Sequence, residues 1–507
     1  MLVVLIAASI AIPVFAQQAH FEHLDNSAPY GFEWPIKEVA VIGAGVSGLL
    51  SYRALSDKHH FDRIRIFERD ENPGGNWHYS DEHAATVPIA SGLGCDWWKA
   101  DYTANIPSQI PFHKVYKAGS NESLRDEFEK NRINHRQPKP LWQSLRANTP
   151  APQQQVPGFS WPFGVEWASH HSKVQRYLRS FASWLGINNG DQSTDVSYNT
   201  RVELVSKRLD NKGRQTGWTL VLRKYVQTYQ GVYVEQYWEE ASATGISLDI
   251  NTFAKTSYLS VREHSNDPRA PIRREAHLSS VAGNTTMIGE IKAFHPIPKH
   301  GNMSTGEIEL LNGTIIFGTG FRYAFPFLPQ YHNSSVSGNE PADSEEQPIV
   351  TDGSHVRSLY LDTFYIDQPT LAFQGQNVGI QTFIYGKYAG EAIARVWSGK
   401  AHLPSAQAQW RHFWKTVEER GGLKKGFQWL DNELNSRSLN YFVAWLNAAA
   451  IENGEKLLEL PPDVTDVMDV WMKARAAGVS VNPDGRNDLQ EIDHVQHQWR
   501  AAIRDDW

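Results

Sequence analysis

The stretch KEVAVIGAGVSGLLSYRAL at residues 37–55 decides the fold of this chain. Residues 39–42 form a short apolar run typical of a buried parallel strand, and the LLSYRAL that ends the stretch is helix-like. The turn between them has the pattern GxGxxG and consists of Gly43, Ala44, Gly45, Val46, Ser47 and Gly48. In such a turn the first glycine permits a tight bend, the second lets the backbone approach a pyrophosphate, and the third lets the helix pack closely on the strand. Because the start of the helix offers free N–H groups to phosphates, the stretch predicts a dinucleotide-binding site.

A second apolar strand strengthens this prediction. RIRIF at residues 63–67 ends at Glu68, twenty residues after Gly48. A carboxylate at this spacing binds a ribose hydroxyl in dinucleotide-binding domains. An acidic residue there favours an unphosphorylated ribose, as in FAD or NAD, over the phosphorylated ribose of NADP. The sequence therefore predicts an α/β fold with a doubly wound, Rossmann-type first domain.

Length and composition narrow the possible functions. The chain has 507 residues, a formal net charge of −7 and a pI near 6.3, so it fits two or three domains and carries no excess of basic residues. Nucleic-acid binding is not expected, because it normally needs a basic face. We find no HExxH, CxxC, P-loop or GxSxG pattern and predict no metal site. The single cysteine, Cys95, is interpreted as a small buried hydrophobic residue.

The N-terminal run MLVVLIAASIAIPVFA at residues 1–16 is apolar and short for a membrane span. It ends with small residues at the positions that signal peptidase prefers, although it lacks a basic start. We expect a cleaved signal peptide, followed by a linker at 17–36, and hence a secretory or extracellular location. An uncleaved N-terminal membrane anchor is the alternative. No other stretch approaches about 18 consecutive apolar residues, so no further membrane insertion is predicted.

The stretch ERDENPGGNWHYS at residues 68–80 resembles the flavin-containing monooxygenases and the related Baeyer–Villiger monooxygenases. The FAD domain of that family carries a GGxW motif shortly after its ribose-binding Glu, and the motif is matched here by Gly74, Gly75, Asn76 and Trp77. LWQSLRANTP at 141–150 is similar to the family's SLxTNxP segment and places Asn148 on its active-site Asn, followed by Thr149. Further similar stretches lie at 156–187, 313–328 and 370–405.

The resemblance covers about 37–405 with one gap, and this chain departs from the family in two places. Ala389 stands where the family has Gln, and the family's linker motif FxGxxxHxxx(Y/F) between its two nucleotide sites is absent. What the resemblance implies is an enzyme in which NADPH reduces FAD and the reduced flavin reacts with O2. The resulting C4a-(hydro)peroxyflavin oxygenates a small substrate with a nucleophilic N or S atom, or a ketone.

The resemblance also implies the residues of the sites. Asn148 is the implied catalytic side chain, placed at the flavin to hold substrate, an oxygen species or NADP. The implied FAD-binding residues are Gly43, Ala44, Gly45, Val46, Ser47, Gly48, Glu68, Gly75, Asn76, Trp77, Asn148 and Thr149. The implied NADPH-binding residues are Ser242, Gly245 and Arg262.

The second nucleotide site begins irregularly, in WEEASATGISLDI at residues 238–250. Gly245 takes the third glycine position, Ser242 the second and Glu240 the first, where a carboxylate repels a pyrophosphate. A predicted strand, SYLSV, then leads to Arg262, which falls where the family meets the 2′-phosphate of NADPH. The apolar strand and glycine that should open this site are missing.

Three explanations of this irregular site remain open. Residues 232–238, VYVEQYW, could act as a surrogate first strand, or the sequence could lack a segment that the natural protein has. We favour the missing segment, because both flanks match the family in register. A third interpretation is an ordinary helix start with Ser242 as N-cap. In that case the match in register between the following strand and the family is a coincidence.

We therefore expect two nucleotide domains and a helical end. The FAD-binding domain is predicted at 37–200 and 311–405, a smaller, truncated NADP-binding-like insert at 201–310, and a helical region at 406–507. The predicted partners are a small-molecule substrate and O2. Because the NADPH site is damaged, an FAD oxidase that does not use NADPH and an inactive flavin-binding remnant are alternatives.

Overall fold

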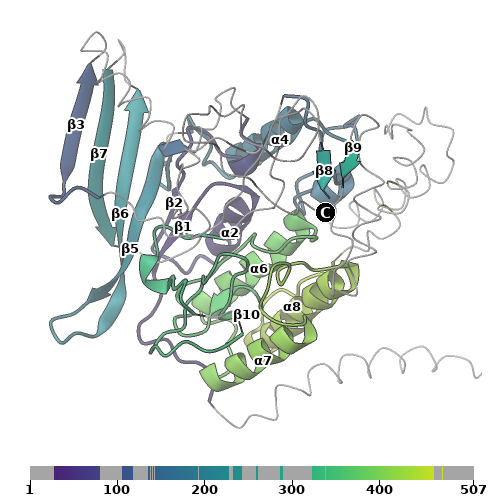
Figure 1. Cartoon of the computed structure of the whole chain (residues 1–507). Helices are drawn as coiled ribbons and strands as arrows, with labels where there is room; N and C mark the ends of the chain where they lie inside the picture. The colour runs from purple at the N-terminus through teal and green to yellow at the C-terminus, as the bar shows by residue number, and fades with distance from the viewer. Residues whose placement is uncertain are drawn as a thin grey trace, which may run out of the picture.

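The computed structural model of the chain is shown in Figure 1. It describes residues 28–79, 106–117, 135–136, 139, 141, 143–191, 193–227, 232–241, 258–260, 286–288, 323–336, 339–461, 467 and 471. Several sequence-based predictions concern residues outside these ranges, namely the signal peptide at 1–16, Cys95, Ser242, Gly245 and Arg262. They stay predictions.

The predicted strand, turn and helix form as expected. Strand β1 (Glu38–Ile42) pairs in parallel with β2 (Arg63–Phe67), and helix α2 (Val46–Ser56) connects them. A third parallel strand, β4 (Val196–Ser197), follows in the order β1-β2-β4. The core of this sheet is made by the fully buried side chains of Val39, Ala40 and Ile66. This parallel arrangement is the Rossmann-type start that the sequence predicts.

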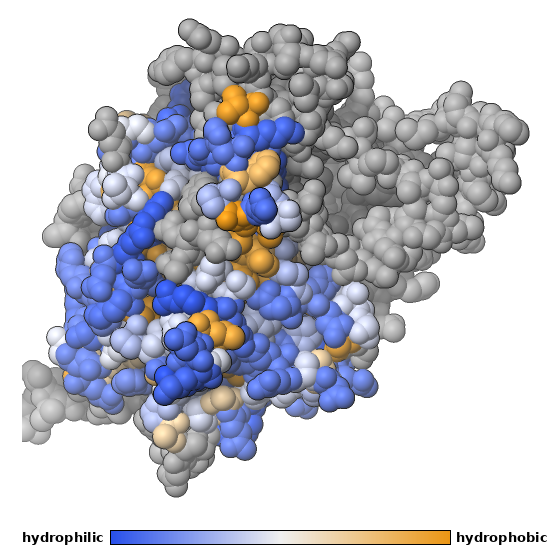
Figure 2. All heavy atoms as spheres, turned by 90° about the vertical axis from the view of Figure 1, so that its left-hand side faces the viewer, coloured by the Kyte–Doolittle hydropathy of each residue, from blue (hydrophilic) through white to orange (hydrophobic). Residues whose placement is uncertain are grey.

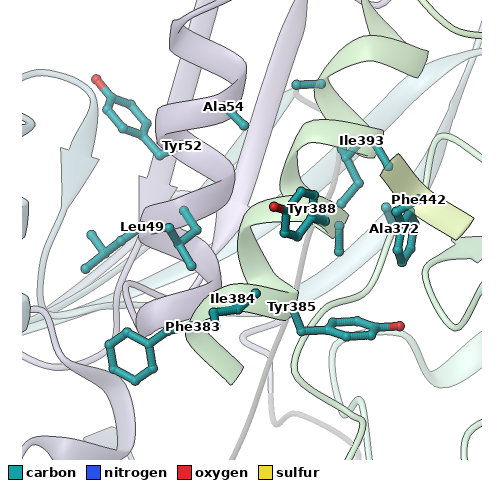
Figure 3. Close-up of a cluster of buried hydrophobic side chains, with 14 of the residues drawn as sticks. Leu49, Tyr52, Ala54, Ala372, Phe383, Ile384, Tyr385, Tyr388, Ile393 and Phe442 are labelled. Atoms are coloured by element: carbon teal, nitrogen blue, oxygen red, sulfur yellow. The ribbon is translucent and has the colours of Figure 1, made fainter. Parts of the chain in front are cut away.

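Helix α6 (Thr382–Trp397) packs along α2, and small residues make the close approach possible. A Cβ atom at Gly386 would lie 2.9 Å from Cδ1 of Leu50, and one at Gly390 would lie 3.4 Å from the Leu50 carbonyl oxygen. Figure 3 shows how Leu49, Ile384 and Phe442 bring side chains of three helices into the same core. The closing part of the predicted FAD domain is therefore packed directly on its first helix.

Two further helices, α7 (Ala406–Glu419) and α8 (Asn432–Asn453), confirm the helical region after 405. Each begins with a side-chain cap: Ser405 Oγ accepts a hydrogen bond from the Ala408 N–H, and Asp431 Oδ1 accepts one from the Leu434 N–H. Gly454, with a φ of 68°, ends α8. Helix α4 (His171–Trp184) precedes β4 and packs against the turn η1 (Gly75–Trp77). None of the helices among the described residues is long and apolar enough to cross a membrane.

An antiparallel sheet extends from the parallel one and forms the left-hand side of Figure 1. Its order is β3-β7-β6-β5, with β3 (Phe112–Lys117), β7 (Val232–Ala241), β6 (Gln215–Gln227) and β5 (Thr200–Leu209). Figure 2 looks at this side of the molecule, where the coloured surface is mostly hydrophilic with a few hydrophobic patches. Inside the molecule, five residues of β5 and β6 share a core with Phe67 and Phe373, namely Val202, Val205, Trp218, Leu220 and Leu222. Strands β5 and β6 thus share a core with the first parallel sheet, and the predicted domain bounds stay a prediction.

Strand β7 rules out one of the three explanations of the irregular second site. It pairs antiparallel with β3 on one side, where Val234 lies opposite Val115, and with β6 on the other, where Glu240 lies opposite Leu220. A strand with antiparallel neighbours on both sides cannot open a parallel nucleotide-binding sheet. The surrogate-strand explanation for 232–238 is therefore wrong.

The remaining elements are short. Strand β8 (Tyr258–Ser260) lies within the predicted SYLSV strand and pairs in parallel with β9 (Thr286–Ile288). Strands β10 (Leu359–Tyr360) and β11 (Phe364–Tyr365) form an antiparallel pair. Two 3-10 turns, η2 (Ala151–Gln154) and η4 (Pro329–Tyr331), complete the described elements.

Candidate active site

The turn after β1 has the geometry that its glycines predict. Gly43 has a φ of 100°, a conformation that favours glycine, and its N–H donates to the Phe67 carbonyl oxygen at 2.9 Å. A Cβ atom at Gly48 would collide with the carbonyl oxygen of Gly43. The helix begins at once, since the Leu49 N–H donates to the Gly45 carbonyl oxygen at 3.0 Å. The turn is thus closed around its third glycine, as the pattern indicates.

The second glycine loop of the sequence packs against the first. The Gly74 N–H donates to the Ala44 carbonyl oxygen at 3.0 Å. A Cβ atom at Gly75, whose φ is 55°, would lie 2.9 Å from Cα of Gly45. The two loops therefore pack against each other as one wall of bare backbone, and a side chain at Gly75 would push them apart.

The N-terminus of α2 opens onto this wall. Its N-cap is Gly45, and no side chain caps its first turn. The helix has 11 residues, so its first N–H groups and its dipole favour a negatively charged group there. A backbone wall without side chains beside an uncapped helix start fits the pyrophosphate of a dinucleotide.

Glu68 lies beside the same turn and is 4% exposed. Its Oε2 accepts a hydrogen bond from the Ala44 N–H at 2.6 Å, and its Oε1 accepts one from the Asp70 N–H at 2.8 Å. Burial, and then the charge of Asp70, raise the pKa of Glu68, whereas Lys139 lowers it. The Nζ atom of Lys139 lies 2.5 Å from Oδ2 of Asp70. The predicted ribose-binding carboxylate is thus fixed in place, inside a group of buried charges.

Asn148 is exposed and Thr149 is half-buried, on a segment that is tied to the start of α4. The Ala147 N–H donates to the Ser169 carbonyl oxygen at 2.8 Å, and the His171 N–H donates to the Leu145 carbonyl oxygen at 3.1 Å. Backbone hydrogen bonds just before Asn148 therefore tie its segment to the start of the helix.

Helix α4 in turn touches the second glycine loop. Nε2 of Gln175 lies 2.9 Å from Nδ1 of His78, and the ring of Tyr79 lies 4.8 Å from that of His171. The contacts therefore connect the Asn148 segment to the glycine loops by way of α4. Asn76 and Trp77 belong to η1, which α4 contacts, and Trp77 packs against the main core.

The tandem histidines at the start of α4 have structural roles. His170 is the N-cap, and its Nδ1 accepts a hydrogen bond from the Ser172 N–H at 3.3 Å. Both His170 and His171 lie within hydrogen-bond distance of the Gln143 carbonyl oxygen. His170 thus caps the helix, and His171 is its first residue.

Sequence reasoning missed two buried features of the site. Lys139 and Asp70 form the ion pair beside Glu68, and no motif marks them. The second feature is Gln374, which is 7% exposed and has no hydrogen-bond partner for either amide atom among the described residues. Gln374 Oε1 and Cα of Ser47 both lie within 4 Å of the position that a Cβ atom at Gly386 would take. A buried amide without a partner next to the first turn of α2 also fits a polar ligand, since leaving it unpaired is unfavourable by about 1–3 kcal/mol.

The predicted NADPH site cannot be assembled in the same way. Glu240, on the first glycine position, lies inside β7, and the described residues include neither Ser242 and Gly245 nor Arg262. The structure thus places the two glycine loops and Glu68 side by side, whereas the second site stays a prediction.

Comparison with known proteins identifies the family. The NAD(P)-binding Rossmann-like domain family matches residues 41–106. Flavin-containing monooxygenase iboF of Amanita muscaria is 34% identical, and the match covers 85% of this chain and 92% of iboF. Flavin-containing monooxygenase ustF2 of Aspergillus flavus is 25% identical over 81% of this chain and 92% of its own length. Among solved structures, S-allyl-L-cysteine S-oxygenase from Allium sativum has a similar fold, with a TM-score of 0.53, 19% identity and coverage of 92% of this chain and 98% of that one.

The alignment with iboF is 508 residues long, yet it takes in 85% of a chain of 507 residues. Part of the relative therefore has no counterpart here. The relatives are named as flavin-containing enzymes and the matched domain family binds NAD(P), so a flavin and a nicotinamide dinucleotide are the cofactors expected for this family. This chain belongs to the flavin-containing monooxygenase family and is a flavin-dependent monooxygenase.

Proposed function

We propose that the protein uses NADPH and O2 to oxygenate a small substrate at a nucleophilic nitrogen or sulfur atom. The observation that carries the proposal is the meeting of the two glycine loops at the uncapped start of α2, beside the buried carboxylate of Glu68. This arrangement fits FAD, and bound FAD supplies the electron transfer and the oxygen activation of the reaction.

We assign the chain's own groups as follows. The backbone of Gly45 and Gly75 and the first turn of α2 bind the pyrophosphate, and Glu68 binds the ribose hydroxyls. Asn148 donates or accepts a hydrogen bond where the substrate or the nicotinamide meets the flavin. Trp77, packed on the core behind η1, excludes water from that side.

The substrate class follows from the family and from one structural relative. The relative of similar fold is an S-oxygenase of S-allyl-L-cysteine, which is a thioether. A thioether or a tertiary amine offers the lone pair that such an oxygenation needs. A ketone is the alternative substrate class, as in the Baeyer–Villiger enzymes that the sequence also resembles.

A second candidate rests on β7. Glu240 is held in an antiparallel sheet, so among the described residues no glycine turn opens the NADPH site. An FAD oxidase that takes electrons from its substrate alone, or an inactive flavin-binding remnant, would need no such turn. We favour NADPH use and propose that the natural transcript encodes a further segment near residue 240. The positions of iboF without a counterpart in this chain support that proposal.

The experiment compares the printed chain with the chain translated from the natural transcript across codons 236–246. Both proteins should purify with a flavin band near ~450 nm. The transcript-derived protein should be bleached by NADPH without air and should consume O2 with S-allyl-L-cysteine or trimethylamine, but less with cyclohexanone. A transcript without the segment, together with flavin reduced by substrate alone, would favour the oxidase. Flavin that responds to neither would favour the remnant.

The N-terminal run is proposed to act as a signal peptide that directs the protein to the secretory pathway. N-terminal sequencing of the protein secreted from a eukaryotic host should start at residue 17. A retained Met1 in a membrane fraction would instead indicate the N-terminal anchor.

A further inference from the structure

Two basic residues hold the loop that follows Glu68. Lys139 Nζ lies 2.5 Å from Oδ2 of Asp70. Arg136 Nη2 lies 3.3 Å from Oε2 of Glu71 and donates to Oδ1 of Asn199 at 2.7 Å. Both basic residues come from far along the chain, so these contacts are tertiary. The loop beside the predicted ribose site is therefore held by two neighbouring ion pairs.

The two ion pairs differ in burial. The side chains of Lys139 and Asp70 are 5% and 4% exposed, whereas those of Arg136 and Glu71 are 26% and 46% exposed. A buried ion pair adds little net stability, because both charges lose their hydration, but removal of one partner leaves an uncompensated buried charge. A role in controlling the charge of a neighbouring group is a physical reason to keep such a pair.

The neighbouring group is Glu68. Its carboxylate and that of Asp70 are both buried on one turn, where the Asp70 N–H donates to Oε1 of Glu68 at 2.8 Å. Two buried carboxylates at this spacing repel each other unless a cation is close to them. Three other groups face this turn. Arg69 acts on Lys139 through its charge, and the half-buried His78 feels the charges of both Asp70 and Lys139. The hydroxyl of Tyr198 donates to the Ile187 carbonyl oxygen at 2.6 Å. Lys139 is thus the buried cation that balances the pair of acids.

We propose that Lys139 and Asp70 form a positioning pair for the cofactor, in which Lys139 cancels the charge of Asp70 so that Glu68 remains a carboxylate aimed at the FAD ribose. This inference rests on the proposed assignment of Glu68 to the ribose hydroxyls. Asp70, in turn, fixes Glu68 through its N–H. FAD binding near neutral pH then depends on a lysine outside every nucleotide-binding motif of the sequence.

The test measures FAD affinity of the full-length apoprotein between pH 6 and 9, by quenching of flavin fluorescence. Lys139→Met should weaken FAD binding at pH 7 by about 10-fold or more, the range for a lost hydrogen bond to a charged group. Without Lys139 the pKa of Glu68 rises further, so the affinity of this variant should recover as the pH increases. The double variant Lys139→Met/Asp70→Asn removes both charges and should bind FAD as the wild type does, with the wild type's pH profile.

Two single variants act as controls. Asp70→Asn alone leaves the positive charge beside Glu68 and should extend tight FAD binding to lower pH, which tests the idea even if Lys139→Met fails to fold. Glu71→Gln breaks only the more exposed pair and should leave FAD affinity unchanged.

Wild-type affinity in Lys139→Met at pH 7 would overturn the inference. A double variant as weak as Lys139→Met would also overturn it, because the pair would then act only on local structure. Glu68→Gln separates this inference from the site on which it rests. If Glu68→Gln binds FAD normally, the ribose assignment fails; if it binds weakly while Lys139→Met is normal, only the positioning pair fails.

Discussion

The turn after β1 and the stretch after residue 237 start from similar sequence material, with small residues, a glycine and an apolar segment behind them. In the first, the strand ends at Ile42, and Gly43 with its φ of 100° turns the chain out of the sheet. In the second, β7 continues through Glu240 to Ala241 and stays paired with β6. The comparison shows that a phosphate-binding turn needs a strand that stops in the right sheet, and not only glycines at the right spacing.

The largest effect is expected for Gly48→Ala, which adds a methyl group to the turn after β1 where the turn is most tightly packed. Its Cβ atom would collide with the Gly43 carbonyl oxygen, so the turn must open. We expect a loss of about 2 kcal/mol or more in the free energy of unfolding, and loss of bound FAD. Urea unfolding and the flavin content of the purified protein measure both. Gly31→Ala, with nothing within 4 Å of the new atom, is the control, and wild-type flavin content in Gly48→Ala would refute the packing argument.

Acid should destabilise the domain that holds the first site. His355 is 1% exposed, and its burial lowers its pKa to about 4. The unfolded chain, with a histidine pKa of about 6.5, binds this proton more readily, so the stability present above about pH 6.5 is lost as the pH falls towards 4. We expect His355 to account for about 2 kcal/mol between pH 7 and pH 4.5, measured by urea unfolding. His355→Gln should flatten the pH profile and the exposed His59→Gln should not; equal slopes in both would show that other groups cause the acid loss.

Gly45→Ala tests whether the turn after β1 binds the cofactor, because it should change FAD affinity without changing the stability of the apoprotein. A Cβ atom there would lie 3.6 Å from Cα of Gly75, an ordinary contact, so the apoprotein should stay within about 0.5 kcal/mol of the wild type. The methyl group occupies space that the pyrophosphate needs, and FAD affinity should fall about 10-fold, equivalent to about 1.4 kcal/mol. Fluorescence titration with FAD gives the affinity. An unchanged dissociation constant would place the pyrophosphate elsewhere.

The smallest effect is expected for Glu240→Gly, which gives the second region its missing glycine. Because residue 240 lies opposite Leu220 in β6, the glycine should stay in the strand and destabilise it by about 0.5–1 kcal/mol. NADPH should reduce the flavin no faster than in the unchanged chain, as stopped-flow absorbance would show. A marked gain in the rate of flavin reduction would mean that the last residues of β7 can leave the strand and form a nucleotide-binding turn.

Local patterns predict the first region well. The bounds of the second strand at 63–67, the glycine turn and the position of Glu68 depend on residues close together in sequence, so periodicity and spacing were enough to predict them. The helices after 405 were predictable for the same reason, from apolar residues at helical spacing.

Long-range pairing explains what the sequence could not predict. Strand β3 joins β7 across more than 100 residues, and no local signal shows that 232–241 will be an inner strand between β3 and β6. The ion pair between Lys139 and Asp70 also joins residues far apart in the sequence. The buried amide of Gln374, which has no hydrogen-bond partner among the described residues, becomes apparent only when α6 packs on α2. These contacts are set by tertiary packing, which composition and spacing do not encode locally.

The central claim is that the first nucleotide site is complete and the second is interrupted in the chain as printed. The most direct measurement is an anaerobic titration of the purified FAD-loaded chain with NADPH, followed at the flavin band near ~450 nm. We expect the protein to hold FAD and to keep its flavin band over minutes of exposure to NADPH. Bleaching within the mixing time would show that the second site works, and a protein without FAD would show that the first does not.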